Sequence, residues 1–218
     1  MRYRAHVIAS IVIVAGLAAI AAVALYRLPP GTQLPTHWGA DGHPDRFSDA
    51  GFALFMPVVL ASALSALMAA LPALEPLQQR MEASAPLYRT AWGGLLAVMV
   101  FVELTVAAPA FGYAVAGTGI LAVIGLLFIV LGNALPKSRP GFFVGIRTPW
   151  TLTDPENWIA THRYGARIMI GGGVALMALA LLPLDDDARA SLVIATVLVV
   201  AATPVIYSYF IWRRAARP

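Results

Sequence analysis

Long apolar stretches alternate along the chain with short polar ones. A helix needs about 20 apolar residues to cross the hydrocarbon core of a bilayer. Six stretches approach or exceed that length, at residues 5–26, 51–72, 88–112, 118–134, 167–183 and 190–212. The polar segments 27–50 and 135–166 are each too short to build an independent core. The pattern therefore predicts one all-α integral membrane domain over residues 1–218, a bundle of six transmembrane helices.

Composition supports a membrane protein. The chain is 60% hydrophobic and 12% charged, whereas ordinary soluble domains are about 25% charged. A chain this apolar cannot cover itself with polar surface, so lipid must be part of its solvent. It contains no cysteine, which excludes disulfides, thiol chemistry and cysteine-based zinc sites.

Basic residues predict the orientation of the six helices. If the N-terminus is cytoplasmic, only three of the 15 Lys and Arg residues fall outside: Arg27, Arg46 and Arg189. Cytoplasmic loops carry an excess of Lys and Arg, so both termini are expected in the cytoplasm, with 27–50 as an outer loop and 135–166 as an inner loop. The basic pI of 9.8 then reflects topology, and direct binding of nucleic acid is not expected.

The first apolar stretch also has features of a signal peptide. It follows the basic start MRYR, and Ala22-Val23-Ala24 offers a small-residue cleavage pattern. Its apolar run of about 20 residues exceeds the usual 7–15 of a signal peptide. We therefore expect a helix that stays uncleaved.

Glu103 lies inside the third apolar stretch, in the sequence AVMVFVELTVAAPA. A charged side chain deep in the bilayer costs several kcal/mol, so an intramembrane carboxylate is a candidate for function. Two interpretations stay open. Glu103 either relays protons or binds a cation, or it forms a structural hydrogen bond with a neighbouring helix.

The outer loop contains a cluster of residues that suit a divalent metal. His37, Asp41, His43 and Asp45 combine imidazole with carboxylate ligands. Their spacing matches neither HExxH nor an EF-hand. The alternative is a turn-rich cap in which these side chains bond to local backbone. Apart from this possible metal, no cofactor is expected.

The inner loop is dense in Pro, Gly and Trp, above all in GFFVGIRTPWTL at residues 141–152. Thr153 and Glu156 have the spacing of a capping box, which predicts a helix that starts near Asp154 and lies on the membrane surface before the fifth span. The basic charges alone are explained by topology, but the other residues indicate a packed loop that also binds an anion, a lipid headgroup or an acidic partner. The candidate binding residues are Asn133, Pro136, Lys137, Arg139, Gly145, Arg147, Pro149, Trp150, Trp158, His162 and Arg163.

These motifs resemble the SdpI/YfhL family of bacterial membrane proteins. The matching inner residues are Leu135, Pro136, Lys137, the run GIRTPWTL at 145–152, Trp158, Thr161, His162 and Arg163. The outer stretch LPTHWG at 34–39, with Gly42, Pro44 and Asp45, resembles the small extracytoplasmic module often found at the start of such proteins. Gly141 stands where the family commonly has Asn, and Ala166 where it commonly has Gly.

The resemblance implies a function that composition cannot. It implies a non-enzymatic protein of the bacterial cytoplasmic membrane that gives immunity to a membrane-active peptide toxin or signals envelope stress to a cytosolic regulator. Membrane lipid is a further expected partner. One alternative is a small ion-coupled transporter, favoured by Glu103 and Asn133. A second is a metal-dependent membrane enzyme, using the outer loop cluster or His162 with Glu103.

Overall fold

Six long helices dominate the computed structural model, which describes residues 3–74, 82–113, 117–141 and 143–215. All six are long and apolar enough to cross a membrane, so the chain is a multi-pass membrane protein. The helices are α1 (Arg4–Arg27), α2 (Ala50–Leu74), α4 (Ala85–Ala107), α5 (Gly119–Ala134), α7 (Pro155–Leu181) and α8 (Asp186–Ala215). Short 3-10 turns extend α4 through Ala108–Phe111 and α5 through Leu135–Lys137.

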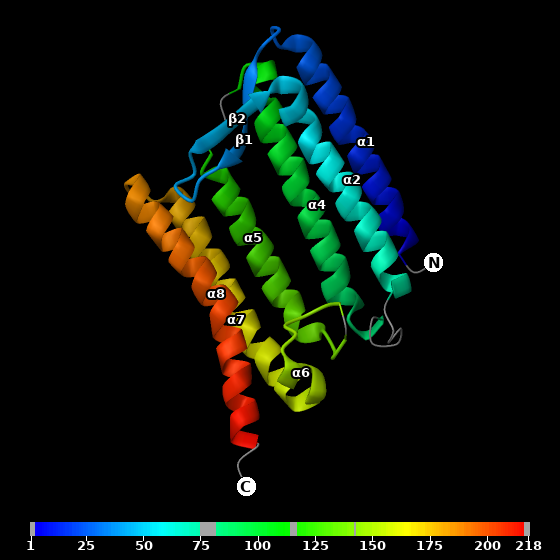
Figure 1. Ribbon diagram of the computed structural model, residues 1–218, viewed down its shortest axis with the longest axis vertical. Helices are drawn as coiled ribbons and strands as arrows, with labels where there is room; N and C mark the ends of the chain where they lie inside the picture. The colour runs from blue at the N-terminus through cyan, green and yellow to red at the C-terminus, as the bar shows by residue number, and fades with distance from the viewer. Residues whose placement is uncertain (1–2, 75–81, 114–116, 142, 216–218) are drawn as a thin grey trace.

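The helices form two units of three (Figure 1). The first unit contains α1, α2 and α4, the second contains α5, α7 and α8, and the two meet where α4 packs on α5. Both ends of the chain and a short helix, α6 (Pro149–Thr153), lie at one end of the molecule, which we call the terminal end. The opposite end carries two strands and the turn between α7 and α8, and we call it the hairpin end.

The outer loop folds into a β-hairpin, which the all-α prediction did not include. Strand β1 (Gln33–Trp38) pairs antiparallel with β2 (Pro44–Asp49). Leu34 is only 2% exposed and packs into the core of the first helical unit. Prolines stand in both strands, and they are tolerated because each strand of a two-stranded sheet is an edge strand. They also obscured the strand pattern in the sequence.

Arg189 connects the hairpin to the second helical unit. Its side chain is 8% exposed and donates hydrogen bonds to the carbonyl oxygens of Asp41 in the hairpin turn and of Leu179 and Leu182 at the end of α7. It also pairs with the carboxylate of Asp186, at 3.1 Å. A cation at a helix C-terminus satisfies carbonyl groups that have no partner within the helix. The hairpin therefore contacts both units.

Helix α7 is continuous from Pro155 to Leu181, so the helix predicted within 135–166 and the predicted fifth span are one element. Asp154 is the N-cap, and its carboxylate accepts a hydrogen bond from the backbone N–H of Glu156. The predicted start near Asp154 is confirmed, but the capping box with Thr153 is wrong, and a single helix replaces the surface helix and separate span. The first turns of α7 carry the polar residues Asn157, Thr161 and His162, which suggested a segment at the membrane surface. These side chains are instead buried against other parts of the protein.

Glycine allows α5 and α7 to pack backbone against backbone. A Cβ atom at Gly125 would lie 2.6 Å from the carbonyl oxygen of Gly173, and one at Gly173 would meet the carbonyl oxygen of Gly125. Two turns further along α5, a Cβ atom at Gly132 would lie 3.0 Å from the carbonyl oxygen of Ala166. Helices in lipid associate through such close contacts between small residues. The glycines of α5 and α7 therefore bring the two backbones into direct contact.

We expect Gly173→Ala to destabilise the protein by about 1–3 kcal/mol, because the added methyl group forces the two backbones apart. The matched control is Gly171→Ala in the same helix, where a Cβ atom meets nothing within 4 Å. The midpoint of thermal unfolding in detergent measures both. Equal midpoints for the two variants would contradict the close contact.

Candidate functional site

His162 fixes the segment that precedes α6. Its Nε2 atom accepts a hydrogen bond from the backbone N–H of Ile146 at 2.9 Å, and its Nδ1 atom lies 2.8 Å from the carbonyl oxygen of Trp158. A backbone N–H can only donate, so Nε2 is unprotonated and Nδ1 donates to the carbonyl. The neutral ring stacks on Trp158 with centroids 4.0 Å apart. Gly145, at φ +115°, is required here because any Cβ atom would lie within 2.7 Å of both rings.

Thr148 and Thr151 form the start of α6. The Oγ1 atom of Thr148 accepts from the backbone N–H of Thr151, while the backbone N–H of Thr148 donates to Oγ1 of Thr151. This is a capping box, with Thr where Glu or Gln is usual. Pro149 occupies the first helical position, where its missing N–H has no cost. Thr151 also donates to the carbonyl oxygen of Ile146, which closes the turn.

Ser208 of α8 joins three elements at the terminal end. Its Oγ atom accepts a hydrogen bond from the indole N–H of Trp150 in α6 at 2.5 Å. Its carbonyl oxygen accepts from the side-chain amide of Asn157 in α7, whose own oxygen accepts from Thr161. The sequence analysis missed Ser208 and Asn157 as contact residues. Ser208 is one of several hydroxyl residues in the apolar run of α8, so the sequence did not single it out.

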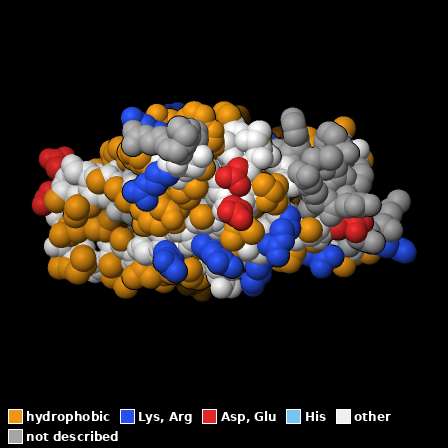
Figure 2. All heavy atoms as spheres, turned by 90° about the horizontal axis from the view of Figure 1, so that it is seen from below, with side chains coloured by type: hydrophobic (Ala, Val, Ile, Leu, Met, Phe, Trp, Pro, Cys, Tyr) orange, Lys and Arg blue, Asp and Glu red, His pale blue; other side chains and the backbone are white. Residues whose placement is uncertain are grey.

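The predicted binding residues divide by exposure. The buried or half-buried residues are Pro136, Gly145, Trp150, Trp158 and His162, and all of these except Pro136 take part in the contacts described above. The exposed ones form a separate set of Asn133, Lys137, Arg139, Arg147, Pro149 and Arg163. Figure 2 shows Lys and Arg side chains spread over the terminal end, among hydrophobic side chains and a few acidic ones. The arrangement suits contact with anionic groups, from a lipid or from an acidic protein segment.

Ser84 ties this end to the first helical unit. Its Oγ atom accepts from the backbone N–H of Arg139 at 2.9 Å and lies 3.2 Å from the carbonyl oxygen of the same residue. Ser84 precedes α4, so the bond links the start of that helix to the chain that follows α5. An apolar cavity of about 280 Å³ lies beside this junction, between Tyr88 of α4, Leu131 of α5 and Phe143.

The four residues of the predicted metal cluster lie in separate contacts. His37 Nδ1 is 2.6 Å from a carboxylate oxygen of Asp45, and this hydrogen bond lowers the pKa of Asp45 below its ordinary value. His43 lies 3.2 Å from Asp186 in α8, while Asp41 accepts from the backbone N–H of His43. Within the described parts of the chain, no three His, Cys, Asp or Glu side chains come together as metal ligands. The metal site stays a prediction without a ligand set.

Glu103 is fully buried in α4, and neither of its carboxyl oxygens has a hydrogen-bond partner among the described residues. The hydrogen bond to a neighbouring helix, one of its two sequence interpretations, is therefore not seen there. An unpaired polar group in such a place is costly, so it requires a physical explanation.

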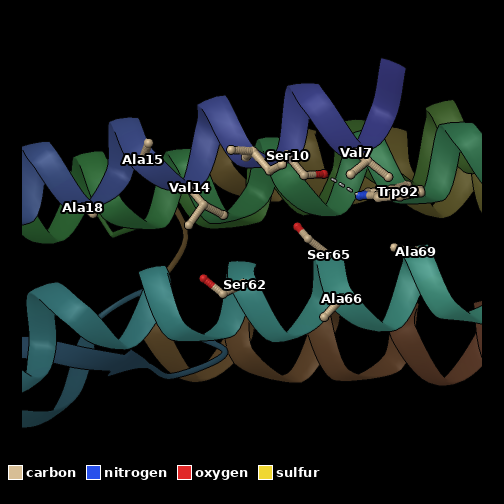
Figure 3. Close-up of a pocket in the computed structure, with 11 residues that line it drawn as sticks. Val7, Ser10, Val14, Ala15, Ala18, Ser62, Ser65, Ala66, Ala69 and Trp92 are labelled. Carbon is tan, nitrogen blue, oxygen red and sulfur yellow. Dashed lines mark hydrogen bonds between the residues drawn. The ribbon is translucent and has the colours of Figure 1, made fainter. Parts of the chain in front are cut away.

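A groove of about 480 Å³ opens between α1 and α2 in the first unit (Figure 3). Ser62 and Ser65 project from α2 toward α1, but their hydroxyls donate to carbonyl oxygens of their own helix. On the other wall, the indole N–H of Trp92 donates to Ser10 at 3.0 Å. Because these polar groups already have partners, the groove suits a hydrocarbon chain better than a polar ligand.

We expect His162→Leu to cost about 1–3 kcal/mol, because the N–H of Ile146 loses its acceptor in a partly buried place. The matched control is Arg163→Gln, an exposed change at the next position, which should stay within about 0.5 kcal/mol. Unfolding midpoints in detergent provide the comparison. If His162→Leu were as stable as Arg163→Gln, His162 would not hold the segment.

Comparisons with known proteins divide the chain into two matched parts. Residues 11–61, which span most of α1, the hairpin and the start of α2, match a domain of unknown function, DUF1648. Residues 137–208 match the SdpI/YfhL protein family. The chain is also 23% identical over 117 residues to "Immunity protein SdpI" of Bacillus subtilis (strain 168). No solved structure matches.

The curated relative is only partly covered. The alignment takes in 53% of this chain and 56% of the relative, so the chain spans about half the length of the protein it matches. The contacts that close around His162 and Ser208 all fall within the stretch that matches the family. That stretch, residues 137–208, is the part of this chain that is similar to the SdpI/YfhL protein family.

Proposed function

We propose that the protein is an immunity or sensor protein of the bacterial cytoplasmic membrane. It would protect the cell from a membrane-active peptide toxin, or report envelope stress to a cytosolic partner. The observation that supports this most directly is the similarity to the immunity protein of B. subtilis. The family match adds support because it covers the hydrogen-bonded network around His162 and Ser208.

The proposed orientation places the terminal end in the cytoplasm. Among the described residues, the only Lys and Arg side chains at the hairpin end are Arg27, Arg46 and Arg189. The terminal end carries Arg4, Arg89, Lys137, Arg139, Arg147, Arg163, Arg167, Arg213 and Arg214. Such an excess is typical of cytoplasmic loops. The hairpin would then meet a peptide from outside, and the exposed basic side chains would meet an acidic partner or lipid headgroups inside.

The hairpin offers a route for coupling between the two sides. It packs on the first unit through Leu34 and on the second through Arg189. If the two units had two arrangements, a ligand with a higher affinity for the hairpin in one of them would favour that arrangement and so change the contact between α4 and α5. That contact continues to Ser84 and Arg139 at the terminal end.

The alternatives have less support. A metal-dependent enzyme needs at least three protein ligands around its metal, and the described residues offer no such group. His162 is already engaged by Ile146 and Trp158. An ion-coupled transporter would depend on Glu103.

Site-specific labelling tests the orientation, and the absence of cysteine makes it direct. Phe47→Cys at the hairpin end and Leu152→Cys at the terminal end both replace exposed apolar side chains. In spheroplasts, a membrane-impermeant maleimide should label Phe47→Cys at once and Leu152→Cys only after permeabilisation. The reverse pattern would overturn the proposed orientation.

Complementation tests immunity. The chain would be expressed in a B. subtilis strain without SdpI and challenged with the peptide that kills that strain. We expect survival to be restored, and we expect Arg147→Gln to weaken protection by about tenfold, the effect of one lost charge-assisted hydrogen bond. Arg213→Gln is the matched control, because it removes an exposed charge from the same end but lies outside the family match.

Two results of this experiment would count against the proposal. If the protein reaches the membrane at a normal level and the cells still die, immunity to this peptide is excluded. If Arg147→Gln and Arg213→Gln protect equally well, the α6 segment has no special part in protection.

A further inference from the structure

Glu103 lies where the three helices of the first unit meet. It is one turn from the end of α4 at Ala107, in the half of the helix nearer the hairpin. Its neighbours along that face of α4, Val106 and Ala107, belong to the buried core shared by α1, α2 and α4. The side chain is fully buried, and both carboxyl oxygens lack a partner among the described residues.

Two hydrogen bonds show which residues lie level with Glu103. Tyr88 of α4 donates to the carbonyl oxygen of Met68 in α2, which runs antiparallel to α4. Ala53 precedes Met68 by as many residues as Glu103 follows Tyr88. Trp92 of α4 donates to Ser10 in α1, which runs parallel to α4. Ala21 follows Ser10 by as many residues as Glu103 follows Trp92. Because rise per residue is constant along a helix, Ala53 and Ala21 stand at the level of Glu103. Both are fully buried, and their methyl groups offer no polar partner.

One acceptor is nevertheless available at this level. Pro57 lies inside α2 and has no N–H, so the carbonyl oxygen of Ala53 lacks its usual helical donor. A carboxylic acid can donate a hydrogen bond to a carbonyl oxygen, whereas a carboxylate can only accept. The neighbourhood therefore favours the protonated form of Glu103.

Among the described residues, no cation is paired with Glu103. Helix α2 contains no ionisable side chain, and α1 has none between His6 and Tyr26. Charged groups do stand at the rim of the hairpin end. They include Arg27, which lies over the ring of Phe111, Arg46 and Asp49 of β2, and the paired His37 and Asp45 on the hairpin. A buried carboxylate without a counter-ion is costly, so the neutral acid is the stable form.

The hairpin covers this core. Leu34 of β1 is part of the same buried cluster, and Trp38 packs against it. Figure 1 shows both strands lying across the hairpin end of α2 and α4. Water on that side reaches Glu103 only when the hairpin moves away or the helices separate.

We propose that Glu103 is a proton-binding site under the hairpin. Its side chain is the neutral acid while the hairpin packs on the core, and it releases its proton to water when the hairpin moves away. In the release step, the O–H bond of the carboxylic acid breaks, the proton passes to water, and a hydrated carboxylate remains. The site would couple the position of the hairpin to protonation inside the bundle. This inference is independent of the proposed immunity function.

Infrared spectroscopy of the protein in liposomes tests the proton site. We expect the C=O stretch of a protonated carboxylic acid at pH 7, and we expect Glu103→Gln to remove it. Glu156→Gln is the matched control, because Glu156 is an exposed glutamate. Uniform labelling of glutamate with ¹³C shifts the band in the unsubstituted protein, so the assignment does not depend on a variant that folds.

A second comparison tests the part played by the hairpin. Leu34→Ala loosens its contact with the core, and we expect the band to disappear at a pH at least one unit lower than in the unsubstituted protein. Phe47→Ala changes an exposed side chain of the same hairpin and should leave that pH unchanged. If no protonated glutamate is seen at pH 7, the proton site is refuted. If Leu34→Ala titrates like Phe47→Ala, the coupling to the hairpin is refuted.

Discussion

In hydrocarbon, a polar atom must find its partner inside the protein, and this constraint shapes the whole structure. The hydroxyls of Ser62 and Ser65 turn back to carbonyl oxygens of their own helix, so the surface they present is apolar. Ser208 instead serves two other elements. Among the described buried side chains, only the carboxyl of Glu103 and the indole N–H of Trp158 break the rule. Of these two groups, Glu103 can bind and release a proton, and it is the one that carries the proposed proton site.

The same constraint explains why the molecule has two units with different characters. The second unit is held by glycine contacts between α5 and α7 and by the polar network around His162 and Ser208. The first unit has a groove between α1 and α2 and an unpaired acid in its core.

Much of the fold could be predicted from the sequence because apolar length is a strong signal for a membrane span. All six predicted stretches overlap the six long helices. The β-hairpin was not predicted, since prolines hide its alternation, and neither was the continuity of α7, since its first turns read as polar. At the site, Gly145 and His162 were predicted as binding residues, and the structure shows them as packing partners through contacts between distant segments. Asn157 and Ser208 are 51 positions apart, and no local pattern connects them.

The bond between Trp150 and Ser208 also sets an order of events during synthesis. The two residues are 58 positions apart, and Ser208 lies in the last helix. At about 5–20 residues per second, the α6 segment waits roughly 3 to 12 seconds for its partner to be made. The family motif thus reaches its final fold only after the last helix has entered the membrane. A chain truncated before α8 would lack Ser208, so Trp150 and Asn157 would lose the hydrogen-bond acceptors that join α6 and α7 to the last helix.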